Sequence, residues 1–330
     1  MEIIKEANKV YRNNFPNTTW YGRCIFLSWF CEIGTCKFCF RSTIKHKIRY
    51  ASSAKRSIES ILVEALLCKI LNWRIEFLTG GYGIFPIDKL VEITKMVSEV
   101  YGKKIWLNLG AIEAKDLKKF MPYIEGIASS IETIEPKLHH YICPDKSIKP
   151  YEEMFENAKS LKKSITIVIG LGEKKEDFKL LANFIEKYNL NRITFYALKP
   201  VKETIFEGTD GPKTKDYLWW IAKTRIRFPK LEIIAGTTPR RYEEVGLLMQ
   251  AGANAFTKFS ATRMFNTKQA QRIEDDIKKS GRKLIGSITK LPDIDWDSEI
   301  QKLNLSDELK KKVQLKLMGY LKRMKNPKRT

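Results

Sequence analysis

The chain has 330 residues, of which 43% are hydrophobic, and its formal net charge is +22 because 60 Lys and Arg stand against 38 Asp and Glu. This length allows a single α/β barrel, and the composition is that of a globular protein with a substantial core. No run of eighteen apolar residues is available to cross a membrane, and residues 1–23 lack the apolar core of a secretory signal. We therefore expect a cytoplasmic protein with no membrane partner. In that reducing compartment the six cysteines favour metal or redox chemistry over disulfides.

The positive charge favours acidic partners, because a field of that sign attracts them and speeds their encounter. Such partners include nucleic acid, phosphorylated substrates, and a small acidic electron carrier such as a ferredoxin or flavodoxin. A surface that is lysine-rich for compositional reasons alone would give the same net charge. The charge therefore does not choose among these classes.

The elements begin with a helical extension that we predict over residues 1–22. After it, apolar runs of about five residues, rich in β-branched and aromatic side chains, recur at intervals of roughly 25 to 40 residues. Such runs are typical of strands that are buried on both faces of a parallel sheet. They cover residues 24–28, 75–79, 105–109, 127–131, 165–169, 193–197, 232–236 and 254–259.

Longer amphipathic stretches separate these runs, for example "SIESILVEALLCKILN" and "KEDFKLLANFIEKYN". A repeated strand–helix order implies parallel strands joined by right-handed crossovers. Eight such repeats predict an α/β fold, a full or nearly full (β/α)8 TIM-type barrel, over residues 23–285. A partial barrel of six units with an appended unit is the alternative. In such barrels the chemistry collects at the C-terminal ends of the strands.

Beyond residue 285 the alternation weakens, and residues 286–330 predict a basic helical extension. Ser306 is placed to cap a helix. The apolar stripe of this helix consists of Leu309, Val313, Leu317, Leu321 and Met324. We expect the stripe to dock on the barrel; contact with RNA or a membrane surface is the alternative.

Half of the cysteines lie in one short stretch, "SWFCEIGTCKFCF", which covers residues 28–40. Cys31, Cys36 and Cys39 have the spacing C-x4-C-x2-C, directly after the first predicted strand. Thiolates are soft ligands that favour iron–sulfur clusters or zinc. A structural zinc site needs a further ligand pair, but no histidine is spaced as a partner; the histidines are His46, His139 and His140. A disulfide would leave one of the three cysteines over.

Two iron–sulfur interpretations remain. The spacing is that of a plant-type ferredoxin, which needs a fourth cysteine, and Cys68 follows 29 residues after Cys39. However, Cys68 shares an apolar helix face with Ile61 and Ala65, where a cysteine behaves as a small hydrophobic residue. The other interpretation is that three ligands are intended. A cubane has four irons, so three thiolates leave one iron open for a further ligand.

At this point the chain resembles the radical S-adenosylmethionine (SAM) enzymes. The resemblance implies that Cys31, Cys36 and Cys39 hold a [4Fe–4S] cluster whose open iron chelates SAM. It also implies reductive cleavage of SAM to a 5′-deoxyadenosyl radical. The commonest spacing in the family is C-x3-C-x2-C, so this chain has one extra residue. Phe38 matches an aromatic position that resembles an adenine contact.

Three downstream motifs match SAM-contacting positions of the same family in order. The glycine turn of "TGGYG" implies a contact to the amino group of SAM, "SSIETIEP" a contact to the ribose, and "VIGLGEKKED" a segment near the adenine. The matching residues are Gly80, Gly81, Ser130, Glu132, Gly170 and Glu173. Each motif also has an ordinary structural interpretation, as a turn glycine or as an acidic residue that caps the next helix.

The segments "ITFYALKPVKETIFEG" and "EIIAGTTPRRYEEVGLLMQAGANAFTKF" resemble the biotin- and thiamin-synthesis-associated region, which extends the resemblance over residues 22–285. Biotin synthase itself inserts sulfur from a second cluster. The positions that align with its ligands are Trp106, Ser164 and Thr237, so that cluster lacks visible ligands here. The closest resemblance is to the HmdB-type family, which is implied to build the iron-guanylylpyridinol cofactor of [Fe]-hydrogenase, although its cysteine spacing is typically x5.

The expected activity is therefore hydrogen abstraction from a small cofactor precursor, with electrons from an acidic ferredoxin or flavodoxin. Tyr196, Lys199, Arg240 and Arg241 lie at later strand ends and are candidate substrate contacts, with surface salt bridging as the alternative for them. Other functions remain open: an archaeal-type lipoyl synthase component, a maturase of the [FeFe]-hydrogenase kind, a ferredoxin-like electron carrier and a tRNA-modifying radical SAM enzyme. The lack of a recognisable RNA-binding module argues against nucleic acid without excluding it.

Overall fold

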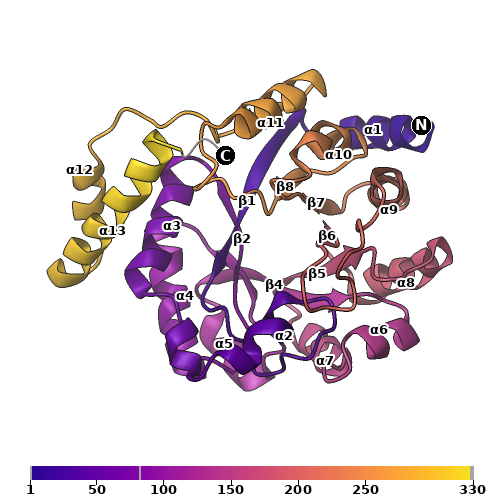
Figure 1. Cartoon of the computed structure of the whole chain (residues 1–330), viewed down its shortest axis with the longest axis horizontal. Helices are drawn as coiled ribbons and strands as arrows, with labels where there is room; N and C mark the ends of the chain where they lie inside the picture. Colours follow the sequence, from indigo (N-terminus) through magenta and orange to yellow (C-terminus); the bar gives the residue numbers. More distant parts are fainter. Residues whose placement is uncertain (1, 82, 328–330) are drawn as a thin grey trace.

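The computed structural model describes residues 2–81 and 83–327. In this part of the chain, eight parallel strands form a closed barrel, in the order β1 to β8, with β8 and β2 on either side of β1 (Figure 1). The strands are β1 (Thr18–Phe26), β2 (Arg74–Thr79), β3 (Ile105–Asn108), β4 (Ile124–Glu132), β5 (Lys162–Ile169), β6 (Arg192–Ala197), β7 (Glu232–Gly236) and β8 (Ala255–Thr257). The predicted (β/α)8 TIM-type barrel is confirmed, and the six-unit alternative is wrong.

Helices surround the barrel on the outside (Figure 1). They are α1 (Glu2–Asn14), α2 (Phe40–Ile44), α3 (Ile58–Ile70), α4 (Ile87–Tyr101), α5 (Ala114–Phe120), α6 (Pro136–Ile142), α7 (Lys149–Asn157), α8 (Phe178–Tyr188), α9 (Thr214–Arg227), α10 (Val245–Gln250), α11 (Lys268–Lys279), α12 (Trp296–Gln301) and α13 (Asp307–Lys325). Short 3-10 turns cover 45–47, 51–54, 175–177 and 242–244. Within the described ranges, no helix combines the length and the apolar character needed to cross a membrane.

The first strand begins earlier than expected. Residues 2–14 form the predicted N-terminal helix, but β1 already starts at Thr18, so part of the segment assigned to the extension belongs to the barrel. A further strand, β9 (Lys283–Ile285), pairs with residues 18–20 at the start of β1. The sequence missed both because short, mixed runs such as "TTW" and "KLI" carry little periodic signal. The division of the chain into three domains, with boundaries after residues 22 and 285, stays a prediction.

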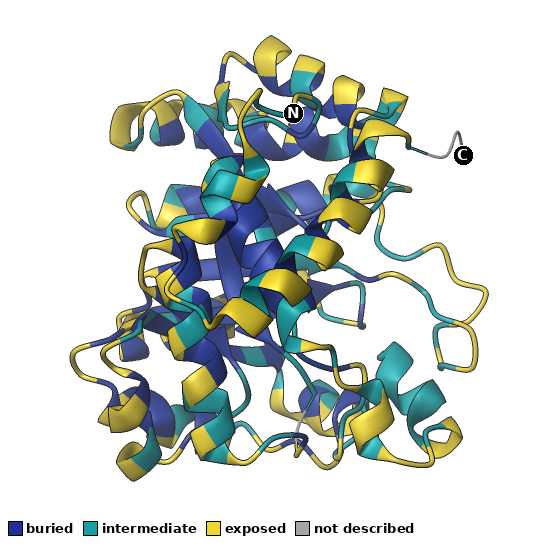
Figure 2. Cartoon of the chain, turned by 90° about the vertical axis from the view of Figure 1, so that its left-hand side faces the viewer, coloured by how far each residue is buried: buried dark blue, intermediate teal, exposed yellow. Residues whose placement is uncertain are grey.

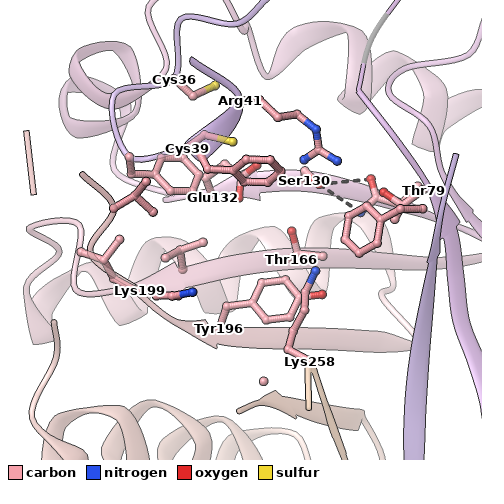
Figure 3. Close-up of a pocket in the computed structure, with 18 of the residues that line it drawn as sticks. Cys36, Cys39, Arg41, Thr79, Ser130, Glu132, Thr166, Tyr196, Lys199 and Lys258 are labelled. Carbon is pink, nitrogen blue, oxygen red and sulfur yellow. Dashed lines mark hydrogen bonds between the residues drawn. The ribbon is translucent and has the colours of Figure 1, made fainter. Parts of the chain in front are cut away.

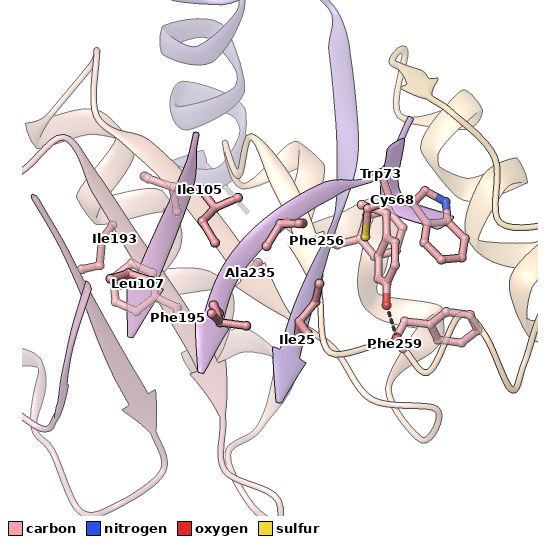
Figure 4. Packing of buried hydrophobic residues seen from close by; sticks show 14 of the residues in the cluster. Ile25, Cys68, Trp73, Ile105, Leu107, Ile193, Phe195, Ala235, Phe256 and Phe259 are labelled. Atoms are coloured by element: carbon pink, nitrogen blue, oxygen red, sulfur yellow. Dashed lines mark hydrogen bonds between the residues drawn. The ribbon is translucent and has the colours of Figure 1, made fainter. Parts of the chain in front are cut away.

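Alternation along the strands divides the apolar residues into two layers. Ile25, Phe195 and their neighbours face the helices and form the main core, which Figure 4 shows around the strands. Cys24, Phe77 and Trp106 belong to a separate small cluster inside the barrel. The period of two that separates these layers is the one that a barrel requires, since successive side chains point inward and outward.

The C-terminal helix docks on the barrel, as the apolar stripe predicts. Helix α13 packs against α3 (Figure 1), and Val313, Leu317 and Met324 are buried. Ser306 accepts the Leu309 N–H, which confirms the predicted cap. Helix α13 covers the outer face of α3, so every residue of α3 from 60 to 68 is buried. Burial on all sides is what a helix with apolar residues around its whole circumference needs. Figure 2 views the molecule from the side of α13 and shows exposed positions on the outer faces of the helices, with buried positions toward the barrel.

Candidate functional site

A cavity of about 700 Å3 lies at the C-terminal ends of the strands. Residues from all eight strands or the segments directly after them line it, so the whole barrel contributes to one site. The volume falls in the usual range for small-molecule sites. Figure 3 shows the arrangement, with the cysteine loop at one side and the end of β8 at the other.

Cys31, Cys36 and Cys39 all line this cavity. Their loop follows β1 and is fixed to α6, because the Lys37 N–H donates to the Ile142 carbonyl over 2.9 Å. A tight turn joins the last two cysteines, with the Cys39 N–H donating to the Cys36 carbonyl over 3.1 Å. The loop therefore presents three thiols to one side of the cavity without contribution from any other segment.

The thiols have different surroundings. A hydrogen bond from the thiol of Cys143 lowers the pKa of Cys36, burial opposes this, and the charge of Lys146 lowers it further. Burial raises the pKa of Cys39, while the charge of Arg41 opposes the rise. Buried apolar surroundings raise the pKa of Cys68, which lies in the α3 core and does not line the cavity. The placement of Cys68 argues against its use as a fourth ligand.

The cysteine loop fits a cubane cluster by its donor chemistry. In the described part of the chain, no three His, Cys, Asp or Glu side chains are arranged to hold one metal ion together. That arrangement is not what a cubane needs, because each of its cysteines binds a different iron. The loop supplies three thiols at the edge of a partly apolar cavity. Three thiolates would bind three irons of a cubane and leave the fourth iron without a protein ligand.

The glycine pair after β2 has two distinct roles. A side chain at Gly81 would overlap the carbonyl oxygen of Phe30 and the Cα of Cys31, so this glycine lets the cysteine loop pack on the end of β2. A side chain at Gly80 would meet only ordinary contacts, the nearest being Leu27 Cβ at 3.5 Å. Both glycines line the cavity. Gly80 is therefore the one free to face a ligand.

Ser130 and Glu132, at the end of β4, also line the cavity. Ser130 exchanges hydrogen bonds of 3.0 and 3.1 Å with the side-chain amide of Asn108. Glu132 forms an ion pair of 2.7 Å with Lys146, in which both side chains are at most 12% exposed. Burial alone would lower the pKa of Lys146, but the charge of Glu132 outweighs burial and holds that pKa well above its ordinary value. The lysine and the amide thus fix the two polar groups that the sequence singled out.

The residues predicted to lie near the adenine, Phe38 in the cysteine loop and Gly170 and Glu173 after β5, have different surroundings. Phe38 lines the cavity and packs against a small apolar cluster that includes Val168 and Leu198, so it lies where an adenine could contact it. Gly170 and Glu173 do not line the cavity. The Glu173 carboxylate instead accepts the N–H groups of Gly170 (2.7 Å), Leu171 (2.9 Å) and Gly172 (3.2 Å). Burial raises the pKa of Glu173, and these hydrogen bonds oppose the rise. This glutamate closes its own turn rather than capping the next helix.

Three of the four candidate substrate contacts line the cavity, and one does not. Tyr196, Lys199 and Arg241 line the cavity, whereas Arg240 is exposed and lines a smaller neighbouring hollow. Arg241 is already engaged, since it pairs with Glu244 at 2.8 Å and donates to the Pro212 carbonyl. The alternative of ordinary salt bridging therefore describes much of what Arg241 does.

Sequence reasoning missed a buried acid inside the barrel, Glu76 of β2. Its carboxylate is fully buried inside the barrel and accepts hydrogen bonds from four neutral donors. Oε1 accepts from Tyr196 and Thr194 at 3.0 Å each, and Oε2 accepts from the hydroxyl of Thr257 and from Cys24 at 2.9 Å. The sequence feature that could have identified it is a single acid within the apolar strand "IEFLT", because an acid that points into the barrel must be hydrogen-bonded. Arg41, Thr166 and Lys258 line the cavity and were also missed.

Two family models match the chain, and together they span most of it. The radical SAM superfamily model matches residues 26–185, and the biotin and thiamin synthesis associated domain matches residues 194–283. The uncharacterized protein MJ0597 of Methanocaldococcus jannaschii is 36% identical, over 98% of this chain and 95% of that protein. Biotin synthase of Clostridium tetani is 26% identical, over 73% of this chain and 75% of the enzyme.

Solved structures share the fold. Methylornithine synthase superposes with a TM-score of 0.72 at 20% identity, covering 86% of this chain and 88% of that one. The FeFe-hydrogenase maturase HydG of Carboxydothermus hydrogenoformans has a TM-score of 0.66 at 16% identity, covering 97% of this chain and 82% of the maturase. From the two family models and the biotin synthase relatives, the chain belongs to the radical SAM superfamily, in its biotin-synthase-like branch, and its cofactors are a [4Fe–4S] cluster and SAM.

Proposed function

We propose that this enzyme abstracts a hydrogen atom from a C–H bond of a small cofactor precursor inside the barrel. The cavity is the observation that carries the proposal, because the three cysteines and inward-facing residues of the barrel line the same space. Cys31, Cys36 and Cys39 would hold the cluster as thiolates. The cluster, when bound, supplies the electron that splits SAM and so generates the 5′-deoxyadenosyl radical.

The chain's own polar groups would position SAM. Gly80 leaves its backbone accessible at the end of β2, where the SAM amino group is expected. Ser130, held by Asn108, and Glu132, held by Lys146, would accept the ribose hydroxyls. Phe38 would form an apolar wall for the adenine. Gly170 and Glu173 would act indirectly, by shaping the turn after β5.

The barrel interior would keep water away from the radical. Phe26, Phe77 and Val168 make part of the cavity lining apolar, and Phe77 and Val168 are at most 5% exposed. Exclusion of water and of other reactants protects a reactive intermediate until it meets the intended bond. Tyr196, fixed by Glu76, would limit where a substrate lies against this wall.

Sulfur insertion from a second cluster is disfavoured by the packing inside the barrel. Trp106 is 2% exposed and belongs to one buried cluster with Cys24, Phe77 and Ala128, and the Arg192 guanidinium lies 4.0 Å from its ring centroid. A bulky side chain therefore occupies one of the positions that align with second-cluster ligands. This favours a hydrogen-abstraction role in [Fe]-hydrogenase cofactor synthesis, in line with the HmdB-type resemblance, over a lipoyl synthase component.

The strong positive charge supports an acidic ferredoxin or flavodoxin as the electron donor, acting in the cytoplasm. The experiment is to reconstitute the cluster anaerobically, add dithionite and SAM, and quantify 5′-deoxyadenosine. Cys36→Ala should abolish product, whereas Cys68→Ala should retain it. Product formation by Cys36→Ala would contradict the ligand assignment. Deuterium transfer from a labelled guanylylpyridinol precursor into 5′-deoxyadenosine would test the pathway, and its absence would remove that assignment.

A further inference from the structure

Lys258 follows β8 and lines the cavity with an unusual backbone, at φ +65°. Its Nζ lies 4.7 Å from the ring centroid of Phe26 and 4.9 Å from that of Tyr196. Figure 3 shows Lys258 beside Tyr196, on the side of the cavity opposite Cys36 and Cys39. Within the described ranges, no acid lies within ion-pair distance of it and no acceptor takes its hydrogen bonds. The ammonium group thus reaches the cavity with its hydrogen-bonding capacity unused.

The cavity as a whole carries excess positive charge. Among the described residues, its lining cations are Arg41, Lys146, Lys199, Lys202, Arg241 and Lys258, and its lining acid is Glu132. Lys146 pairs with Glu132 and Arg241 pairs with Glu244. The other four cations have no acidic partner in the described part of the chain. Lys199 and Lys202 are exposed at the mouth, whereas Lys258 is only partly exposed.

The two cofactors would not neutralise this excess. An oxidised [4Fe–4S] core with three thiolates carries one net negative charge. SAM bound to iron through its amine and carboxylate would be neutral overall, because the chelating amine has lost its proton and the sulfonium balances the carboxylate. The two cofactors would together contribute one negative charge against the four unpaired cations, so further counter-charge must come from elsewhere.

The nearest buried acid does not supply that charge to Lys258 directly. Glu76 accepts a hydrogen bond from Tyr196, but among the described residues it forms no ion pair with Lys258. Its oxygens are occupied by Tyr196, Thr194, Thr257 and Cys24. Glu76 therefore fixes the ring of Tyr196, and the ring and Lys258 together form one side of an open polar position.

We propose that Lys258 binds an anionic group, a carboxylate or a phosphate, on the substrate, while Phe26 and Val168 contact its carbon skeleton. This inference rests on the proposed function, because it takes the cavity to be the active site. The anion would lie on the side of the cavity away from the cysteine loop. The C–H bonds at the other end of the substrate, nearer the cysteine loop, would then face the SAM-derived radical.

The test uses three probes that share a six-carbon chain: hexanoate, hexyl phosphate and hexanol. Each is titrated by ligand-observed NMR under argon against the reconstituted holoenzyme with SAM bound. We expect at least one anionic probe to bind about tenfold more tightly than hexanol, as a charged hydrogen bond of this kind supplies. A stronger effect of hexyl phosphate than of hexanoate would identify a phosphate, and the reverse a carboxylate.

Lys258→Met should remove the difference between the anions and hexanol, and Lys258→Arg should keep most of it. Lys223→Met is the matched control, because it removes one positive charge from an exposed site on α9 and should leave the difference unchanged. Equal binding of anions and hexanol by the wild type, or an undiminished preference in Lys258→Met, would overturn the proposal. The wild-type preparation is also assayed for 5′-deoxyadenosine. Its presence without anion preference refutes only the substrate class, and its absence refutes the proposed function.

Discussion

Tyr196 donates a hydrogen bond of 3.0 Å to Oε1 of Glu76, and so links β6 to β2 across the interior of the barrel. Burial raises the pKa of Tyr196 well above its ordinary value, and the charge of Glu76 raises it further. The phenol therefore remains a donor throughout the range in which the protein is handled. The ring it fixes lines the cavity and lies 4.9 Å from the Lys258 Nζ, so its position determines part of the space left for a substrate.

Gly236→Ala tests how firmly this ring is held. A methyl group at Gly236 would overlap Cδ1 of Tyr196, and the hydrogen bond to Glu76 prevents the ring from moving away freely. Overpacking of this kind costs about 1–3 kcal/mol. We expect the free energy of unfolding, measured by urea denaturation, to fall by about that amount.

The control is the same substitution in a Tyr196→Ala background. Removing the ring removes the overlap, so the glycine substitution should then cost less than about 0.5 kcal/mol, within the range of ordinary surface changes. An equal cost in both backgrounds would show that Tyr196 is not what excludes a side chain at this position.

Gly81→Ala and Gly80→Ala form a matched pair for the cysteine loop. The first substitution would push against the backbone of Phe30 and Cys31, so the loop could not close on β2. We expect Gly81→Ala to retain well under half of the wild-type iron and acid-labile sulfide after reconstitution. Gly80→Ala should retain nearly all of it. Equal iron content in both variants would contradict the packing role assigned to Gly81.

Glu64 of α3 links the C-terminal helix to the barrel. It pairs with Arg23 at 2.8 Å and Arg56 at 2.9 Å, and it accepts the Tyr320 hydroxyl of α13 at 3.1 Å. Burial alone would raise the pKa of Glu64, but the charges of Arg23 and Arg56 outweigh it and hold that pKa below the ordinary value. Its stabilising effect is therefore complete above the unfolded-state pKa of about 4.3 and is lost as the pH falls through the lower folded-state pKa.

Glu64→Gln should accordingly reduce the free energy of unfolding by about 3 kcal/mol at pH 7, since it leaves the charges of two largely buried guanidinium groups unpaired. The difference from wild type should shrink as the pH is lowered from 5 toward 3 in a series of urea titrations. Glu308→Gln, at an exposed pair with Lys312, is the control and should show no comparable change. A pH-independent difference for Glu64→Gln would argue against a depressed pKa.

Much of the architecture could be predicted because barrel strands are short, apolar and bounded by amphipathic helices. The eight predicted runs all fall on strands of the barrel, and the stripe from Leu309 to Met324 docks as its spacing indicated. The start of β1 could not be predicted, because "TTWYG" lacks an apolar run and its strand state is set by pairing with β8 and β9. Tertiary contacts, not local propensity, decide such segments.

The site was predictable where a motif is local and was not where residues meet across the barrel. Cys31, Cys36 and Cys39 lie on one loop, so their spacing alone brought them together. Glu76 is hydrogen-bonded to Thr257, the residue before Lys258, which lies 181 positions away in the sequence, and only barrel closure places these strands near each other. Gly170 and Glu173 form a self-contained turn that does not line the cavity, and their predicted place near the adenine of SAM stays a prediction.

The central claim is that three cysteines leave one iron open for SAM. The most direct measurement is electron–nuclear double resonance on the reduced, reconstituted protein with SAM labelled by 17O in its carboxylate and 15N in its amino group. We predict hyperfine coupling from both labels, showing that SAM binds an iron of the cluster, and loss of that coupling in Cys31→Ala, Cys36→Ala and Cys39→Ala. A wild-type cluster whose spectrum is unchanged by SAM and shows neither coupling would contradict the account.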